Sequence, residues 1–236
     1  AYTCARFTDE NWTLEQAQMA KYDGICVKLG LTPGMRMLDI GCGWGALAIH
    51  AAKNYGVTVL GVTISDAQAS YARKWIAEEG LADSIDIVLQ DYRDIDETVP
   101  FDAIASVGMM ENVGSRNLTT YCSKISRLLA EDGRFLNQAI AARGKSKVGR
   151  YTFAQRYVFP DGELFDISKV ASSLQDAGFE VVSIDSLRRH YATTLTHWVK
   201  NLADNYDSIE AEIGPVRTRV FRLFLTASIN KFETGR

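Results

Sequence analysis

The stretch MRMLDIGCGWG, residues 35–45, decides the fold. An apolar run that contains Asp39 leads directly into a loop with a glycine at every second position, and an alanine-rich helical pattern follows over 46–53. This order predicts a strand, a glycine turn and a helix. Glycine lets the backbone turn tightly and approach a ligand closely, and the first turn of a helix offers unpaired N–H groups. The stretch is therefore a candidate ligand site.

The glycine loop matches neither common phosphate-binding motif. No Gly-Lys-Ser/Thr follows it, which excludes a P-loop. A dinucleotide fingerprint needs its third glycine where the chain has Ala46, and position 44 is a bulky Trp. The loop therefore favours a nucleoside without a pyrophosphate, which means S-adenosylmethionine. The alternative is a structural turn that binds no ligand.

Length and composition favour one α/β domain over residues 1–236, since 236 residues with 47% hydrophobic content can bury a sizeable core. The net charge of −3, from 26 basic and 29 acidic residues, argues against nucleic acid binding. The four cysteines lack C-x-x-C spacing, so we expect no metal site and no disulfide, and a reducing cytoplasm fits. No apolar run approaches the ~20 residues that span a bilayer. The chain begins without Met, which suggests a fragment or a trimmed domain.

Strand and helix patterns alternate along the chain. We expect strands at 35–40, 57–62, 85–89, 101–107, 134–140 and 179–184, and helices at 14–29, 45–55, 66–79, 117–129 and 167–177, with a mostly helical chain from 195 onward. This alternation predicts a doubly wound, mostly parallel sheet. Ligands of such a sheet lie beyond the carboxyl ends of the strands, which places five separate stretches on one face.

Seven stretches carry a family resemblance. They are YTCARF (2–7), LDIGCGWG (38–45), GVTISDAQ (61–68), LQDYRD (89–94), FDAIASVGMMENVG (101–114), YVFPDGEL (157–164) and HYATTLTHW (190–198). They span nearly the whole chain in family order, and several are specific to the family rather than to methyltransferases at large. In them the chain resembles the cyclopropane-fatty-acyl-phospholipid synthases, which share a fold and a cofactor with the mycolic acid cyclopropane synthases.

The resemblance implies a Rossmann-like class I methyltransferase fold with helical additions that cover an acyl site. It implies S-adenosylmethionine as the donor and an unsaturated acyl chain of a membrane phospholipid as the acceptor. A cation formed on that chain loses a proton, which gives a cyclopropane ring or else a methylene or methyl-branched chain. The expected location is cytoplasmic, peripheral to the inner face of the membrane, and a homo-oligomer is left open.

The resemblance also assigns cofactor contacts. Tyr2 and Thr3 match the pair that contacts the methionine end. Thr63 and Gln68 stand where many such folds place an acidic residue on the ribose, and their neutral groups can still bond hydroxyls. For Gln68 the alternative is a solvated helix face. The whole expected set is Tyr2, Thr3, Asp39, Gly41, Gly43, Trp44, Thr63, Ile64, Gln68, Gln90, Asp91 and Tyr92.

Within that set, Asp91 and Tyr92 would serve the adenine. The carboxylate would accept from the exocyclic amine and the ring would contact the base. The alternative for both residues is a surface turn.

A second set of positions matches a bicarbonate site of the family. This ion would take the proton that the cation loses. The matching residues are Cys4, Glu111, Gln138, Ile140 and Tyr191. An ionised Glu111 alone would repel an anion, so Tyr191 and backbone N–H groups would donate while Glu111 accepts the bicarbonate hydroxyl. We interpret Cys4 as a packing residue or a neighbour of the anion rather than a nucleophile.

Two departures from the family concern proton transfer. Asn112 and Gln138 each replace a family histidine, so two titratable imidazoles become neutral amides. Either the anion site survives with a weaker proton relay, or the proton leaves by another path, which would favour a methylene or branched product over a ring. Ser228 stands where some relatives have cysteine, so no cysteine nucleophile is required.

Basic residues with interleaved aromatic residues suggest contact with an anionic phospholipid surface, and a solvated loop is the alternative. The segment carries Arg143, Lys145, Lys147, Arg150 and Arg156 with Tyr151, Phe153 and Tyr157, and the last helix carries Arg217, Arg219 and Arg222.

The chain lacks a further N-terminal segment of the synthases and stops before a last edge strand, so we expect the protein to continue. Two other functions stay open at this point. A methyltransferase for a small soluble acceptor would have a short polar cavity. A non-catalytic lipid- or cofactor-binding subunit would fit the loss of two imidazoles.

Overall fold

A parallel five-stranded sheet in the order β3-β2-β1-β4-β5 forms the centre of the computed structural model, which describes residues 2–142 and 152–235. The strands are β1 (Arg36–Ile40), β2 (Thr58–Thr63), β3 (Ile85–Leu89), β4 (Phe101–Val107) and β5 (Leu129–Gln138). The chain starts at the centre, moves to one edge and returns to the other side, which is the doubly wound topology that the sequence predicts.

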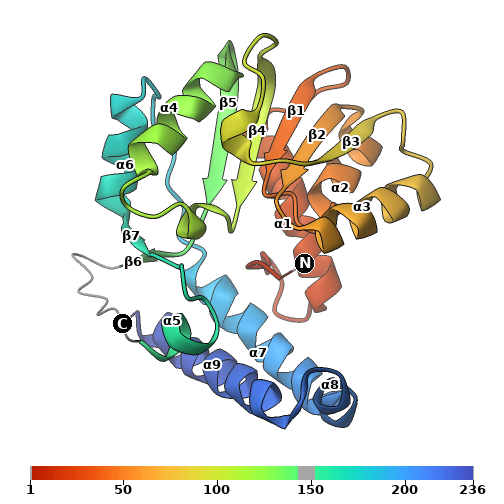
Figure 1. Cartoon of the computed structure of the whole chain (residues 1–236), viewed down its shortest axis with the longest axis vertical. Helices are drawn as coiled ribbons and strands as arrows, with labels where there is room; N and C mark the ends of the chain where they lie inside the picture. Colours follow the sequence, from red (N-terminus) through yellow and green to blue (C-terminus); the bar gives the residue numbers. More distant parts are fainter. Residues whose placement is uncertain (1, 143–151, 236) are drawn as a thin grey trace.

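Helices cover both faces of the sheet (Figure 1). One face packs on α1 (Leu14–Leu29), α2 (Ala46–Tyr55) and α3 (Asp66–Glu78). The other packs on α4 (Leu118–Leu128) and α6 (Ile167–Asp176). Two separate apolar cores result, one on each side of the sheet.

The alternation along β1 decides which side chains meet which helices. Met37 packs in the core with α1 and α2, whereas Leu38 and Ile40 pack in the core with α4. Side chains of a strand alternate between its faces, so Asp39 lies on the α1 side with Met37. The carboxyl group of Asp39 is therefore directed toward the face of the sheet that α1 covers.

Helix α1 has a well-defined start and end. Thr13 caps it through a capping box with Gln16, and Gly30 ends it in the left-handed conformation. Because a cap satisfies backbone groups that the helix leaves unpaired, the observed bounds are the predicted ones, residues 14–29.

A separate helical layer lies beyond the carboxyl ends of the strands (Figure 1). It consists of α7 (Arg188–Asp204), α8 (Tyr206–Ile213), α9 (Pro215–Thr234) and the short α5 (Phe153–Tyr157). Two short strands, β6 (Ala141–Ala142) and β7 (Phe165–Asp166), pair nearby. The arrows of β4 and β5 point toward this layer, and the N-terminus lies between it and the sheet (Figure 1).

The N-terminal segment, residues 2–7, bridges α1 and the helical layer. The Arg6 N–H donates to the Ala17 carbonyl at 3.0 Å, on α1. The Ala5 N–H donates to Thr194 Oγ1 at 3.0 Å, on α7. The segment is therefore fixed from both sides.

The sixth strand predicted at 179–184 is wrong. Phe179 stacks on Phe135 of β5 at 5.6 Å between ring centroids, but the following residues form no ladder in the described part of the chain. Val182 is 87% exposed and Ile184 is 59% exposed. An alternating apolar pattern becomes a strand only where a neighbouring strand accepts its hydrogen bonds, and β5 pairs with β4 alone among the described residues.

Other bounds differ by less. β5 begins at Leu129, five residues before the prediction, and ends two residues earlier, at Gln138. The helical C-terminal part starts at Arg188 instead of 195. Arg143, Lys145, Lys147, Arg150 and Tyr151 lie outside the described residues. No helix in the described ranges combines the length and the apolar character that crossing a bilayer requires.

Candidate functional site

The glycine loop bends back onto the end of β2. The N–H groups of Gly41 and Cys42 both donate to the Val62 carbonyl, at 2.9 and 3.0 Å. Gly41 has a φ of +73°, and a Cβ there would lie 2.9 Å from Met109 Cγ. Gly43 has a φ of +56°, and the nearest side chain to it is the ring of Tyr2. Any larger residue would therefore strain the loop and, at position 41, close the space above it.

Asp39 is a buried carboxyl just before this loop. It is 2% exposed, and its Oδ2 has no hydrogen-bond partner among the described residues. Burial raises the pKa of Asp39 to about 7, and the charge of Lys21 opposes this rise. An unpaired buried polar atom costs free energy, so its presence here favours a ligand that completes it.

A chain of hydrogen bonds joins three predicted cofactor residues. Thr63 Oγ1 donates to Gln68 Oε1 at 2.9 Å, and Gln68 Nε2 donates to the Tyr2 hydroxyl at 3.0 Å. Thr63 is buried at the end of β2, and Ser65 caps the helix that carries Gln68. The N-terminus, β2 and α3 thus meet above the glycine loop.

Thr3 is held by two residues that the sequence analysis did not single out. Lys21 Nζ donates to Thr3 Oγ1 at 2.8 Å, and Gln18 Nε2 donates to the Thr3 carbonyl at 3.0 Å. The available signal was a Gln and a Lys three residues apart on the buried face of α1, beside Ala17 and Ile25.

Trp44 and Ile64 lie at the rim of the site. Trp44 is 39% exposed and meets Tyr71 edge-on at 5.3 Å. Ile64, which follows β2, is 80% exposed. Large exposed apolar side chains beside a glycine loop provide contact area for a flat ligand.

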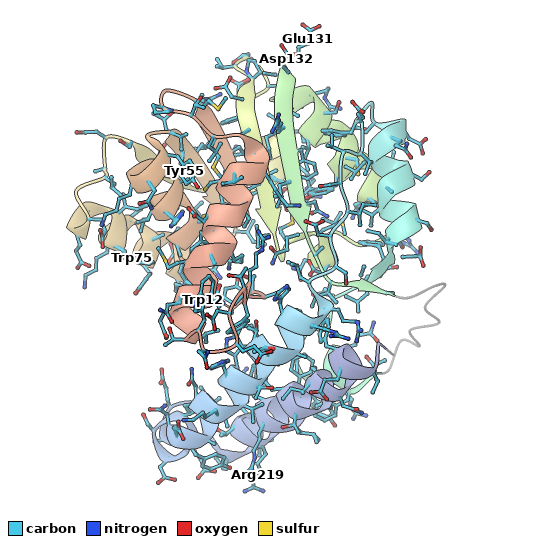
Figure 2. All side chains as sticks on the ribbon, turned by 180° about the vertical axis from the view of Figure 1, so that it is seen from behind. Trp12, Tyr55, Trp75, Glu131, Asp132 and Arg219 are labelled. Carbon is cyan, nitrogen blue, oxygen red and sulfur yellow. The ribbon has the colours of Figure 1, made fainter. Side chains whose placement is uncertain are left out.

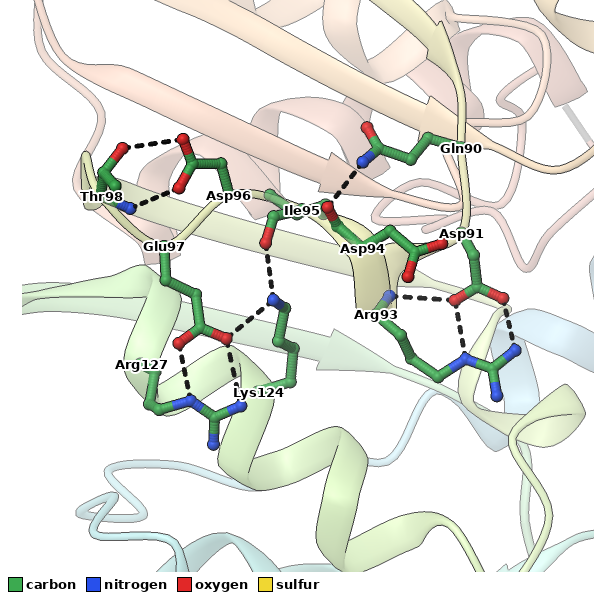
Figure 3. Close-up of polar contacts among 10 residues, drawn as sticks. All are labelled: Gln90, Asp91, Arg93, Asp94, Ile95, Asp96, Glu97, Thr98, Lys124 and Arg127. Atoms are coloured by element: carbon green, nitrogen blue, oxygen red, sulfur yellow. Dashed lines mark hydrogen bonds and ion pairs between the residues drawn. The ribbon is translucent and has the colours of Figure 1, made fainter.

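The loop after β3 holds the predicted adenine residues Asp91, which Figure 3 draws, and Tyr92. Both oxygens of Asp91 accept from Arg93, at 2.9 and 2.6 Å, and the Arg93 side chain lowers the pKa of Asp91. Tyr92 packs edge-on against Tyr121 at 5.5 Å. Gln90 Nε2 turns away to the Asp94 carbonyl at 2.8 Å. In this arrangement Asp91 is paired with a cation, and its bond to an adenine amine stays a prediction.

The same loop is anchored to α4 (Figure 3). Lys124 is 7% exposed and donates to the Ile95 carbonyl at 2.6 Å and to Glu97 at 2.7 Å. Arg127 makes two further bonds to Glu97. This network fixes the backbone that follows β3, and with it the position of Tyr92.

Glu111 lies in a short 3₁₀ turn, Met110–Asn112, that follows β4. Its Oε1 accepts from the Ile140 N–H at 2.7 Å, while its Oε2 is buried without a partner among the described residues. Burial raises the pKa of Glu111, and the bond from Ile140 opposes this rise. A carboxyl group with one free buried oxygen can accept a proton or bind a small ligand.

Tyr191, Gln138 and Cys4 lie near Glu111. Burial raises the pKa of Tyr191, and the charges of Cys4 and Glu111 add to the rise, so these groups interact. Gln138 Nε2 donates to the Cys4 carbonyl at 3.4 Å. Burial raises the pKa of the Cys4 thiol to about 12, which favours packing over nucleophilic attack. The structure thus brings together all five residues predicted for the anion site.

The two departures from the family pattern have different surroundings. Asn112 is exposed, and its amide bonds the Met109 carbonyl at 3.4 Å. Gln138 is half-buried and faces Cys4. Ser228 bonds the Phe224 carbonyl of its own helix at 2.7 Å. Of these substitutions, Gln138 alone bears on the interior of the site.

An open groove of about 560 Å³ leads from Tyr2 into the helical layer. Its walls are Trp198, Asn201, Leu202, Asn205, Ser208, Ile209 and Leu225. Apolar and amide side chains both line it. Its lining residues come from α7, α8 and α9, together with Tyr2, one of the predicted cofactor contacts.

These features fit S-adenosylmethionine. The left-handed glycines leave backbone open above the strand tips, Asp39 has a free oxygen for an ammonium group, and the Thr63–Gln68–Tyr2 chain offers neutral groups for hydroxyls. A bicarbonate also has matching groups, since Glu111 has a free oxygen and the Tyr191 hydroxyl makes no hydrogen bond within the described residues.

The family model described as mycolic acid cyclopropane synthetase matches residues 1–236. The chain belongs to this family. A probable fatty acid methyltransferase of Pseudomonas putida is 43% identical, over 100% of this chain and 61% of the relative. The cyclopropane-fatty-acyl-phospholipid synthase of Escherichia coli K12 is 39% identical, over 98% of this chain and 58% of the relative. The chain therefore spans about three-fifths of these two curated relatives.

A solved structure of the same family agrees in fold. The mycolic acid cyclopropane synthase CmaA1, complexed with SAH and CTAB, superposes with a TM-score of 0.93 at 32% identity, over 100% of this chain and 86% of that one. The fold is thus the Rossmann-like class I methyltransferase fold.

Proposed function

We propose that this cyclopropane synthetase family member transfers a one-carbon unit from S-adenosylmethionine to the double bond of an unsaturated acyl chain in phospholipid. The observation that supports it most is the buried carboxyl of Glu111, with one free oxygen beside Tyr191, next to the predicted cofactor contacts. A cation on an acyl chain must lose a proton, and these groups provide an acceptor that is shielded from water.

The chain's residues have distinct roles in this proposal. When bound, S-adenosylmethionine supplies an electrophilic methyl group. Thr63 and Gln68 hold the nucleoside part above the glycine loop. Tyr2 contacts the methionine end, and Asp39 receives its ammonium group. Glu111 accepts the proton through Oε2, while the bond from Ile140 keeps Oε1 fixed. Where bicarbonate binds, Tyr191 donates to it, Glu111 accepts from its hydroxyl, and the ion supplies a further proton acceptor.

Cyclopropane is the product that we propose first. Asn112 is exposed, so its replacement of a histidine leaves the buried acceptor unchanged. Gln138 stays in the site as a donor to the Cys4 carbonyl. A methylene or methyl-branched product is the second outcome, since an amide cannot carry a proton.

We also propose a peripheral location on the inner face of the cytoplasmic membrane. Helix α9 carries a stripe of exposed residues, Val216, Arg219, Arg222 and Leu223, whose spacing places them on one side of the helix. Arg219 points away from the sheet, at the end of the molecule opposite Glu131 and Asp132 (Figure 2). Apolar and cationic side chains on one stripe suit an anionic bilayer surface.

Lipid analysis of cells that express the full-length protein tests the function. We expect acyl chains heavier by one carbon, and catalytic hydrogenation then separates a ring from a methylene group, which are isomers. The variant Glu111→Gln should lower product formation by about 100-fold while binding S-adenosylhomocysteine as the parent does. Asn112→Gln, at an exposed position, is the matched control and should keep full activity. Unmodified acyl chains with the parent protein would contradict the proposal and favour a binding module.

A further inference from the structure

A polar cluster outside the groups used in the reaction above consists of Gln18 and Lys21, which are buried on α1, and Thr3 of the N-terminal segment. Lys21 is 3% exposed and Gln18 is 7% exposed. Lys21 Nζ donates to Gln18 Oε1 at 2.6 Å and to Thr3 Oγ1 at 2.8 Å, and Gln18 also holds the Thr3 carbonyl. Burying an ammonium group costs much free energy unless it is bonded, so this placement needs a reason beyond the packing of α1.

Lys21 and Asp39 face each other across the start of the site. Asp39 lies on the α1 side of β1, and the charge of each group opposes the pKa shift of the other. Burial lowers the pKa of Lys21 to about 7. The two groups form no ion pair within the described residues, and Asp39 Oδ2 stays unpaired. A ligand that carries both charges would favour the ionised form of each group, with its ammonium group beside Asp39 and its carboxylate near Lys21.

The backbone around Thr3 connects the Gln18–Lys21 pair to the glycine loop. A Cβ on Gly108, just after β4, would lie 2.9 Å from Thr3 Cγ2, so Thr3 packs directly on that turn. The adjacent Tyr2 contacts Gly43 and accepts from Gln68. A displacement of Thr3 would therefore move Tyr2 from the loop.

We propose that Lys21 is a positioning residue for the amino-acid end of S-adenosylmethionine: it holds the Tyr2–Cys4 segment through Thr3 and sets a positive pole opposite Asp39. The amino-acid end of this cofactor is a zwitterion, with an ammonium group that suits Asp39 and a carboxylate that suits the neighbourhood of Lys21. Gln18 fixes the lysine by accepting one hydrogen bond from its ammonium group through Oε1. This inference rests on the proposed cofactor.

Binding measurements with two ligands test it. S-adenosylhomocysteine contains the amino-acid end, and adenosine lacks it. By isothermal titration calorimetry, Lys21→Met should weaken S-adenosylhomocysteine by about tenfold or more and change adenosine by less than about twofold. Lys74→Met, at an exposed position on α3, is the control and should leave both affinities unchanged. Equal losses for the two ligands, or none for S-adenosylhomocysteine, would overturn the inference.

A second series avoids any change to α1. Thr3→Val removes the hydroxyl that accepts from Lys21, and Thr3→Ser keeps it. We expect Thr3→Val to reproduce the loss of S-adenosylhomocysteine affinity, Thr3→Ser to retain the affinity, and the double variant with Lys21→Met to be no weaker than either single one. Additive losses would show that the two residues act separately and would contradict the inference. If the parent protein binds no S-adenosylhomocysteine, the proposed function fails first, which is a distinct result.

Discussion

Asp39 and Glu111 are two buried carboxyl groups in different surroundings. Asp39 faces a lysine across the start of the site, whereas Glu111 faces a tyrosine and accepts a backbone N–H. Burial raises the pKa of both. Separate environments for two acids allow separate roles: Asp39, near a lysine, can pair with a cationic ligand, and Glu111, near a tyrosine, can exchange a proton in the chemistry.

Asp39→Asn should become more stable relative to the parent as the pH rises from about 4.5 to about 7. The folded protein holds the Asp39 proton up to a pKa of about 7, against 3.8 for the ordinary group, so its contribution to stability is present below 3.8 and is lost as the pH rises through 7. The gain should exceed ~1 kcal/mol, since one pKa unit is worth about 1.4 kcal/mol. Urea unfolding at several pH values measures it.

This pH range separates Asp39 from its neighbours. Lys21 has a lowered pKa of about 7. Its contribution therefore increases the stability of the folded protein as the pH rises from about 7 to 10.5, which is a different pH range and the opposite sign. Burial, together with the charge of Asp39, also raises the pKa values of Tyr22, Cys26 and Cys42, which lie well above pH 7. A pH-independent difference between Asp39→Asn and the parent would contradict the buried charge.

Site residues that belong to a local sequence motif could be predicted from the sequence. Site residues that are brought in only by a tertiary contact could not. Gly41, Gly43 and Asp39 follow from a strand–glycine–helix pattern that is visible within eleven residues. The pairing of Lys21 with Thr3 joins residues 18 positions apart through a fold that sequence periodicity does not place in three dimensions. Roles that the resemblance assigns to Tyr2 or Tyr191 stay predictions, although the structure brings these side chains to the site.

At the scale of elements, the bounds of helices and strands could be predicted where local signals such as helix caps mark them. Helix α1 and strands β3 and β4 have the predicted bounds because Thr13, Gly30 and the apolar runs are local signals. β5 begins early because Leu129 pairs with Phe101 across a register irregularity, which no local pattern reveals. The segment 179–184 has the sequence pattern of a strand, but without a described neighbouring strand it forms no ladder, and Val182 and Ile184 are exposed.

Lys124→Met should destabilise the protein by ~1–3 kcal/mol, since it leaves the buried Ile95 carbonyl and one oxygen of Glu97 without their donor. Thermal and urea unfolding measure the loss. Lys200→Met, on the exposed face of α7, is the control and should stay within ~0.5 kcal/mol of the parent. Equal stability of Lys124→Met and the parent would show that the network of Figure 3 does not anchor the loop after β3.

At the scale of the molecule, charge and apolar exposure are unevenly distributed. The carboxyl ends of the strands face the helical layer that contains α9 (Figure 1). The exposed stripe described above lies on α9. Glu131 and Asp132 lie at the far end of the sheet (Figure 2). The groove that begins at Tyr2 is lined by residues of α7, α8 and α9 and so lies in the same layer as this stripe.

Arg219→Gln should weaken binding to vesicles of anionic phospholipid by about fivefold, since one basic residue near such a surface contributes ~1 kcal/mol. Arg217→Gln removes the same charge from another side of α9 and is the matched control. Vesicle co-sedimentation at low and high salt measures both. Identical losses for the two variants would indicate a diffuse charge effect and contradict docking through the stripe.

The double attachment of residues 2–7 has a consequence for motion. One peptide segment contacts the glycine loop through Tyr2 and α7 through Ala5, so tightening at one contact restrains the other. We expect added S-adenosylhomocysteine to slow deuterium uptake by the amides of 188–204 in mass-spectrometric exchange. Unchanged uptake there, with protection confined to 38–45, would mean that the glycine loop and α7 fluctuate independently. Slower uptake would mean that a ligand bound at the glycine loop controls how often the backbone of α7 opens.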